Sequence, residues 1–138
     1  MNPERPLSEY GRQQSESLGR FMAANGVRVN AVWHSSLLRA KQTATQIALA
    51  IDAQELLEQR DDLSPMDSIN SVESSIRDYN QNLMIVGHLP FMGNLFSHLL
   101  TGEKNASLAQ FSTACAASLI YSRGACSLVW FVGPEQLG

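Results

Sequence analysis

Cysteine is scarce in this sequence: among 138 residues there are two, Cys115 and Cys126. Two cysteines are too few for a disulfide scaffold, and these two lack the paired spacing of a structural zinc site. A β-hairpin predicted over residues 116–132 does not place these two cysteines opposite each other. We therefore expect both to be free thiols that pack as small apolar side chains.

Long apolar runs and an excess of positive charge are also absent. No stretch approaches the roughly 20 apolar residues that a membrane-spanning helix needs, and residues 1–6 contain no apolar segment of a secretion signal. The formal net charge of −3 disfavours nucleic-acid binding through phosphate neutralisation. The sequence thus predicts a cytoplasmic protein with neither a membrane nor a nucleic acid as its partner.

The composition that remains fits a single domain over residues 1–138. Hydrophobic residues make up 44% of the chain and charged residues 17%, which is the balance of a folded chain rather than a disordered one. A chain of this length buries a core of ordinary size.

Apolar periodicity predicts strands that alternate with helices. We expect helices over residues 8–24, 37–48, 69–76 and 90–101, strands over residues 29–34 and 82–87, a loop over residues 56–67, and a C-terminal β-hairpin with strands at 116–121 and 127–132. Ser8 is a candidate N-cap of the first helix. The alternation predicts an α/β domain with a largely parallel sheet, in which ligands bind beyond the carboxyl ends of the strands.

Two of the predicted strand ends carry a histidine. His34 closes the segment "VNAVWH", and His88 lies in "LMIVGHLP", between an apolar strand and a new helix. A histidine at a strand end can carry a proton or bind phosphoryl oxygens near neutral pH. It can equally be a core histidine bonded to a backbone carbonyl.

An anion site is predicted in "HSSLLRAKQTA", residues 34–44. Backbone N–H groups at a helix N-terminus attract anions, and the guanidinium of Arg39 can fork two phosphoryl oxygens, which a lysine cannot do. The alternatives are that Arg39 is a solvated helix residue and that Ser35 and Ser36 only cap the helix.

Three segments in order resemble the histidine phosphatase superfamily, in particular its short SixA-like phosphohistidine phosphatase branch. They are "PLSEYGRQQ" (6–14), "SSLLRAKQTA" (35–44) and "VGHLPFMGNL" (86–95). "DDLSP" (61–65) is similar to the acidic segment of that family. The resemblance implies a three-layer, phosphoglycerate-mutase-like α/β sandwich in which helices flank a mostly parallel sheet.

The resemblance also implies a reaction. A histidine attacks the phosphorus, the substrate leaves, and water hydrolyses the phosphohistidine intermediate, without a metal or another cofactor. Arg39 and His88 would be catalytic and, with Ser35 and Ser36, would bind the phosphoryl group. Asp62 is a candidate general acid or, alternatively, a solvated loop carboxylate. The substrate would be a phosphohistidine-bearing protein or a small phosphomonoester.

One departure from the family matters for activity. The family carries its nucleophile in an Arg-His-Gly motif at the end of a first, central strand, and this sequence contains no Arg-His-Gly. We therefore expect a domain that is truncated at its N-terminus relative to the family and lacks that strand. His34 is a weak substitute because it ends a different strand, and His98 lies along a helix away from the strand ends.

Three functions stay open at this point. The first is a phosphatase that uses a nucleophile outside these residues. The second is a catalytically inactive module that binds phosphate or a phosphoprotein. The third is a structural or interaction domain without a pocket. The sequence does not predict an oligomeric state.

Overall fold

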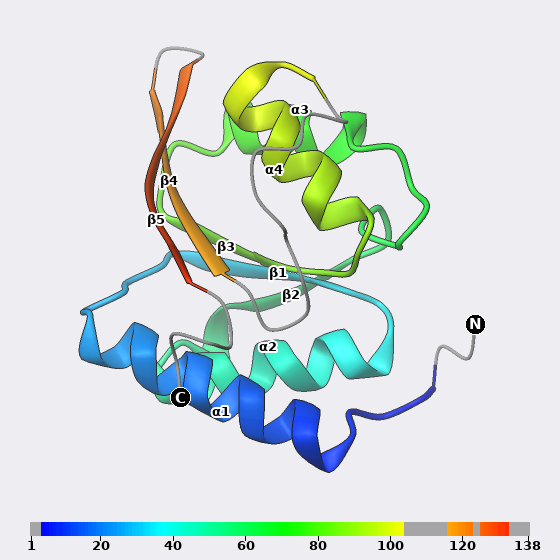
Figure 1. Ribbon diagram of the computed structural model, residues 1–138, viewed down its shortest axis with the longest axis vertical. Coiled ribbons are helices and arrows are strands. Elements are labelled where there is room, and N and C mark those ends of the chain that lie inside the picture. The colour runs from blue at the N-terminus through cyan, green and yellow to red at the C-terminus, as the bar shows by residue number, and fades with distance from the viewer. Residues whose placement is uncertain (1–3, 104–115, 123–124, 133–138) are drawn as a thin grey trace.

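Strands alternate with helices along most of the chain (Figure 1). The computed structural model describes residues 4–103, 116–122 and 125–132. Its helices are α1 (Glu9–Ala24), α2 (Leu38–Ala50), α3 (Asn70–Asp78) and α4 (Phe91–Thr101), with a 3₁₀ turn at Gln54–Leu56. Its strands are β1 (Ala31–Ser35), β2 (Leu57–Arg60), β3 (Leu83–Val86), β4 (Ala116–Ser122) and β5 (Ala125–Val132).

The sheet that organises the domain is parallel, with the strand order β2-β1-β3. In its register, Val32 of β1 lies beside Leu57 on one side and beside Met84 on the other. Strands β4 and β5 form a separate antiparallel hairpin. Within the described residues, β3 therefore has a strand partner on one edge only.

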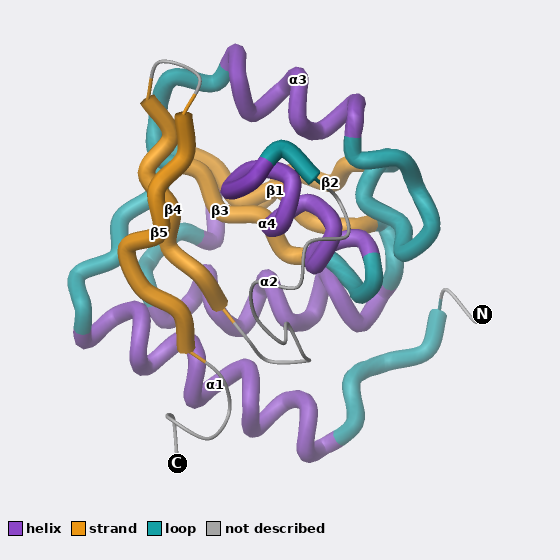
Figure 2. Tube along the Cα trace, turned by 45° about the horizontal axis from the view of Figure 1, so that its top comes forward, coloured by secondary structure: helices purple, strands orange, loops and turns teal. Residues whose placement is uncertain are grey.

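Helices cover both faces of this sheet, as the two ribbon views show (Figure 2). The faces differ because successive β1 side chains point in opposite directions. Val32 packs with Ala44 and Ala48 of α2, whereas Trp33 packs in the cluster that holds Val72 of α3 and Phe91 of α4. The predicted three-layer α/β sandwich with a mostly parallel sheet is confirmed.

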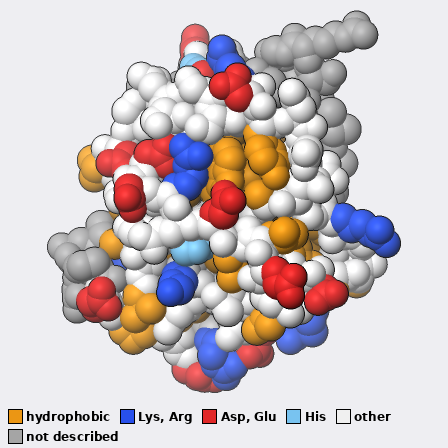
Figure 3. All heavy atoms as spheres, turned by 180° about the vertical axis from the view of Figure 1, so that it is seen from behind, with side chains coloured by type: hydrophobic (Ala, Val, Ile, Leu, Met, Phe, Trp, Pro, Cys, Tyr) orange, Lys and Arg blue, Asp and Glu red, His pale blue; other side chains and the backbone are white. Residues whose placement is uncertain are grey.

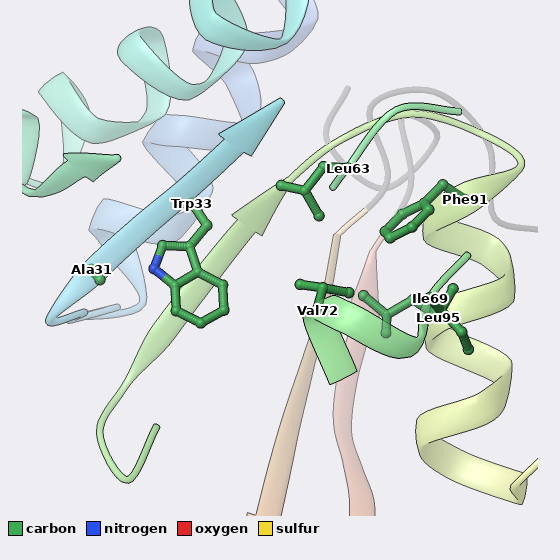
Figure 4. Packing of buried hydrophobic residues seen from close by; sticks show 7 residues of the cluster. All are labelled: Ala31, Trp33, Leu63, Ile69, Val72, Phe91 and Leu95. Carbon is green, nitrogen blue, oxygen red and sulfur yellow. The ribbon is translucent and has the colours of Figure 1, made fainter. Parts of the chain in front are cut away.

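The core on the α3–α4 side is well filled (Figure 4). Leu63, Val72 and Phe91 have no exposed surface, and the Trp33 ring meets the Tyr79 ring edge-on with centroids 5.5 Å apart. Burial of one such side chain stabilises a fold by about 1.5–3 kcal/mol. This cluster fixes the loop that holds Leu63 and the start of α4, the two segments that follow β2 and β3.

The first helix begins and ends as its sequence predicts. The Ser8 hydroxyl accepts a hydrogen bond from the Gly11 amide at 3.0 Å, so Ser8 is the N-cap. The chain leaves α1 at Asn25, followed by Gly26 with φ of +66°. Gly19 allows α1 to approach α2 closely, because a Cβ atom there would lie 2.9 Å from the Cβ of Ala50.

The loop predicted over residues 56–67 is wrong in part, because Leu57–Arg60 forms strand β2. Three of its four residues are polar, and its side chains are intermediate or exposed. An edge strand of this kind has no apolar alternation to read, so its pairing with β1 decides its conformation.

The predicted hairpin is confirmed as β4 and β5. Cys126 lies opposite Tyr121 in its register, and Cys115 falls outside the described residues. No helix in the described part of the chain is long and apolar enough to cross a membrane.

Candidate oxyanion site at the carboxyl edge of the sheet

The carboxyl ends of the three parallel strands meet at one edge of the sheet. Ser35 of β1 lies beside Arg60, the last residue of β2, and His34 lies beside Val86, the last residue of β3. His88 follows β3 by two residues. Strand register therefore brings Ser35 and His88 to one edge of the sheet, which is where parallel α/β sheets bind ligands.

The N-terminus of α2 opens at this edge. The N-cap residue is Leu37, which contributes no side-chain hydrogen bond, and the fully buried Ser35 accepts the Leu37 amide through its hydroxyl at 3.2 Å. Ser36 is exposed. Ser35 thus braces the turn before the helix, and neither serine is its N-cap. The helix dipole at this end favours an anion.

His88 carries an unsatisfied ring nitrogen. The ring is half-buried, and its Nε2 atom is buried without a hydrogen-bond partner among the described residues. Burial, and to a smaller extent the positive charge of Arg39, lower the pKa of His88 from 6.5 to about 4. Arg39 therefore lies close enough to act on His88, and the imidazole is neutral at pH 7.

This pair is suited to an oxyanion. A negative charge placed between the Arg39 guanidinium and the His88 ring would offset their mutual repulsion and favour the protonated imidazole. The anion would also give the buried Nε2 atom a hydrogen-bond partner. A buried polar atom without a partner destabilises a fold by about 1–3 kcal/mol.

Asp62 lies at the same edge, but it belongs to an ion pair. Its two carboxylate oxygens accept hydrogen bonds from Nε and Nη2 of Arg60 at 2.8 and 2.6 Å, and Ser71 donates another at 2.7 Å. The Arg60 hydrogen bonds are the main reason that the pKa of Asp62 falls to about 2. Asp62 is therefore an anion at neutral pH.

A shallow, open depression of about 360 Å³ lies beside this ion pair, lined by Arg60, Asp61 and Asp62. The Arg60 guanidinium also lies over the Trp33 ring, 4.4 Å from its centroid, and donates to Ser75 at 3.0 Å. Sequence reasoning missed Arg60 and Trp33 as parts of this edge. The only available signal was an arginine two residues before Asp62, in a segment taken for a loop.

The other two histidines have contacts elsewhere. His34 is buried, with Nδ1 3.0 Å from the Ser35 carbonyl oxygen. His98 lies on α4, and its Nδ1 meets the carboxylate of Glu73 on α3. Among the described residues, no group of three or more histidine, cysteine or acidic side chains is placed to hold a metal ion.

On the face opposite to that of Figure 1, acidic and basic side chains are interspersed around an apolar patch (Figure 3). This face carries no extended region of a single charge.

Comparison with known proteins shows what the chain is similar to. The sequence model of the histidine phosphatase superfamily (branch 1) matches residues 2–69, just under half of the chain. Over this range the chain resembles the histidine phosphatase superfamily. The matched range includes Ser35, Arg39 and Asp62, and His88 lies beyond it.

The chain is also similar to SixA, over nearly its whole length. It is 24% identical to the phosphohistidine phosphatase SixA of Escherichia coli strain K12, over 96% of this chain and 84% of that protein. The structure of the protein histidine phosphatase SixA complexed with tungstate superposes with a TM-score of 0.90 at 23% identity, covering 100% of this chain and 90% of the other.

The wider fold is also shared with a phosphoglycerate mutase. The enzyme of that name from Bacillus anthracis superposes with a TM-score of 0.68 at 14% identity, covering 97% of this chain and 85% of the other. The phosphoglycerate-mutase-like architecture that the sequence predicts is confirmed.

Proposed function

We propose that this chain is a member of the histidine phosphatase superfamily that binds the phosphoryl group of a phosphohistidine-bearing protein and serves its dephosphorylation. The observation that carries the proposal is the buried Nε2 atom of His88, which lacks a hydrogen-bond partner among the described residues, at the edge of the sheet where the parallel strands end. The similarity to SixA supports phosphohistidine as the substrate class.

Each residue at this edge has a proposed role. Arg39 forks two phosphoryl oxygens, and His88 donates a hydrogen bond to a third. Ser35 holds the turn before α2 through its bond to the Leu37 amide, and the exposed Ser36 is free to donate its hydroxyl to the ligand. These groups stabilise the charge that develops on the phosphoryl oxygens during transfer.

The role of Asp62 depends on Arg60. A general acid has to hold a proton at the working pH, and the pKa of about 2 leaves Asp62 ionised. Asp62 can donate a proton to a leaving group only if the substrate displaces Arg60 and raises that pKa. Until then we assign Asp62 to orienting Arg60 beside the open depression that both residues line.

These residues do not include an attacking nucleophile for the phosphorus. The superfamily motif Arg-His-Gly does not occur in the 138 residues, and His34 is committed to the Ser35 carbonyl. We expect the 138-residue chain to bind the phosphoryl group without releasing phosphate. This makes a phosphoprotein-binding module the second candidate function, and a small phosphomonoester the alternative ligand.

The test uses the purified chain with two probes. Tungstate, an oxyanion that a SixA structure contains, reports binding by calorimetry, and a phosphohistidine-bearing protein reports turnover by phosphate release. We expect tungstate to bind the chain, and Arg39→Ala or His88→Ala to weaken binding about tenfold or more. Arg28→Ala, which alters an exposed arginine, is the matched control.

The outcomes separate the candidate functions. Binding without phosphate release favours the binding module for these 138 residues, and release abolished by His88→Ala favours a complete enzyme. Unchanged tungstate affinity in both Arg39→Ala and His88→Ala would refute the proposed site.

A further inference from the structure

The backbone around His88 is held by a single residue of the next helix. The Met92 amide donates a hydrogen bond to the His88 carbonyl at 2.8 Å. This bond closes the turn between the end of β3 and the first turn of α4, and it fixes the peptide unit that carries His88.

The side chain of Met92 makes a second contact, with the residue before His88. A Cβ atom on Gly87 would lie 3.0 Å from the Sδ atom and 3.2 Å from the Cγ atom of Met92. The thioether therefore occupies the space that a side chain at position 87 would need. The Leu63 carbonyl oxygen would lie 3.7 Å from the same Cβ atom, which is ordinary van der Waals contact.

Met92 is itself anchored in the core. It packs, partly buried, against the cluster that contains Leu63, Phe91 and Leu95. Figure 4 shows Phe91 and Leu95 on α4, with Leu63 near them. Met92 thus links this core cluster to Gly87 and His88, the two residues that follow β3. An unbranched thioether fills such an irregular gap well.

We infer that Met92 is a positioning residue for His88: its thioether packs on Gly87 and its amide holds the His88 carbonyl, which together set the imidazole at the carboxyl end of β3. The inference rests on the proposed function, because it concerns the same oxyanion site. Met92 touches neither the ligand nor the reacting atoms and acts only through His88.

The test compares three variants with one control. Met92→Ala removes the thioether, Met92→Leu keeps an apolar side chain of similar size, and Gly87→Ala pushes on the thioether from the other side. Met66→Ala is the matched control, because Met66 is 84% exposed. Two quantities are measured: tungstate affinity by calorimetry and the titration of the His88 ring by NMR.

We expect Met92→Ala and Gly87→Ala to weaken tungstate binding about tenfold, because small displacements of a binding group have large effects. We expect Met92→Leu to restore affinity to within about twofold of the original. Water that reaches the loosened ring should raise the pKa of His88 from about 4 toward 6.5. Met66→Ala should change neither quantity.

Folded Met92→Ala and Gly87→Ala variants with unchanged tungstate affinity and an unchanged His88 titration would overturn the positioning role. Failure of the proposed function gives a different result, in which Arg39→Ala and His88→Ala bind tungstate as tightly as the unaltered chain. The His88 titration then still decides the role of Met92, because it needs no ligand.

Discussion

The carboxylate of Asp62 accepts two parallel hydrogen bonds from the guanidinium of Arg60, at 2.8 and 2.6 Å. Fork-to-fork pairing of this kind fixes both side chains at the edge where the three parallel strands end. The same guanidinium lies over Trp33, so the pair is tied to the core of the α3–α4 layer. The pair lines the open depression at this edge of the sheet.

Removal of the Asp62 carboxylate should destabilise the fold, because Arg60 loses its ion-pair partner. We expect Asp62→Asn to lower the free energy of unfolding at pH 7 by about 1 kcal/mol, the scale of a partly exposed pair with good geometry. Chemical denaturation measures the change. Asp61→Asn, at the exposed neighbouring carboxylate, should change stability little.

The effect of Asp62→Asn should depend on pH with a defined sign. The folded-state pKa of about 2 lies below the ordinary value of 3.8, so the carboxylate contributes stability above pH 3.8. That contribution is lost as the pH falls toward 2. A destabilisation by Asp62→Asn that persisted at pH 2 would contradict the ion pair as its cause.

His88 predicts a second pH dependence, in a higher range. Its folded-state pKa of about 4 lies below 6.5, so the unfolded chain binds a proton more readily between these values. The free energy of unfolding should therefore fall as the pH drops from 6.5 to 4. Because the ring is half exposed to solvent, we expect a loss of about 1–2 kcal/mol rather than the full value of the shift.

Denaturation of His88→Gln at several pH values isolates this contribution. The variant keeps a polar side chain but does not titrate, so its stability should fall less between pH 6.5 and 4. His98→Gln is a control at a histidine on α4 that meets Glu73. Equal slopes in the original chain and in His88→Gln would show that the His88 ring is not buried against Arg39.

The close approach of α1 and α2 predicts a packing defect. We expect Gly19→Ala to destabilise the fold by about 1–3 kcal/mol, because the new methyl group would overlap Ala50. This outweighs the gain of about 1 kcal/mol that alanine brings to a helix interior. Thermal or chemical denaturation measures the net effect.

A second substitution tests the cause. Ala50→Gly removes the methyl group that Gly19→Ala would meet, so the double variant should recover much of the loss. Additive effects of the two changes would mean that the helices do not touch at this point.

Much of the fold is predictable from local signals. Ser8 and Gly26 mark the two ends of α1, and the apolar run of β3 stands out from its surroundings. Strand β2 could not be predicted, because Leu57–Arg60 is mostly polar and becomes a strand by pairing with β1. The same tertiary dependence hid the stacking of Arg60 on Trp33.

Some residues of the candidate site could likewise be predicted from the sequence, and others depend on tertiary contacts. The resemblance carried by three segments in order predicts Arg39 and His88 as site residues, and the register of β1 and β3 together with the start of α2 brings them to the same edge of the sheet. The ionised state of Asp62 was not predictable, because it depends on Arg60, Ser71 and their geometry. Met92 carries no sequence signal beyond its place one turn after His88.

The central claim is that Arg39 and His88 bind one oxyanion together. The most direct test is a double-mutant cycle for tungstate affinity, with Arg39→Ala, His88→Ala and the double variant measured by calorimetry at pH 7. We expect each single change to weaken binding about tenfold or more, and the double change to cost clearly less than the sum of the two. Full affinity in either single variant, or strictly additive losses, would contradict the central claim.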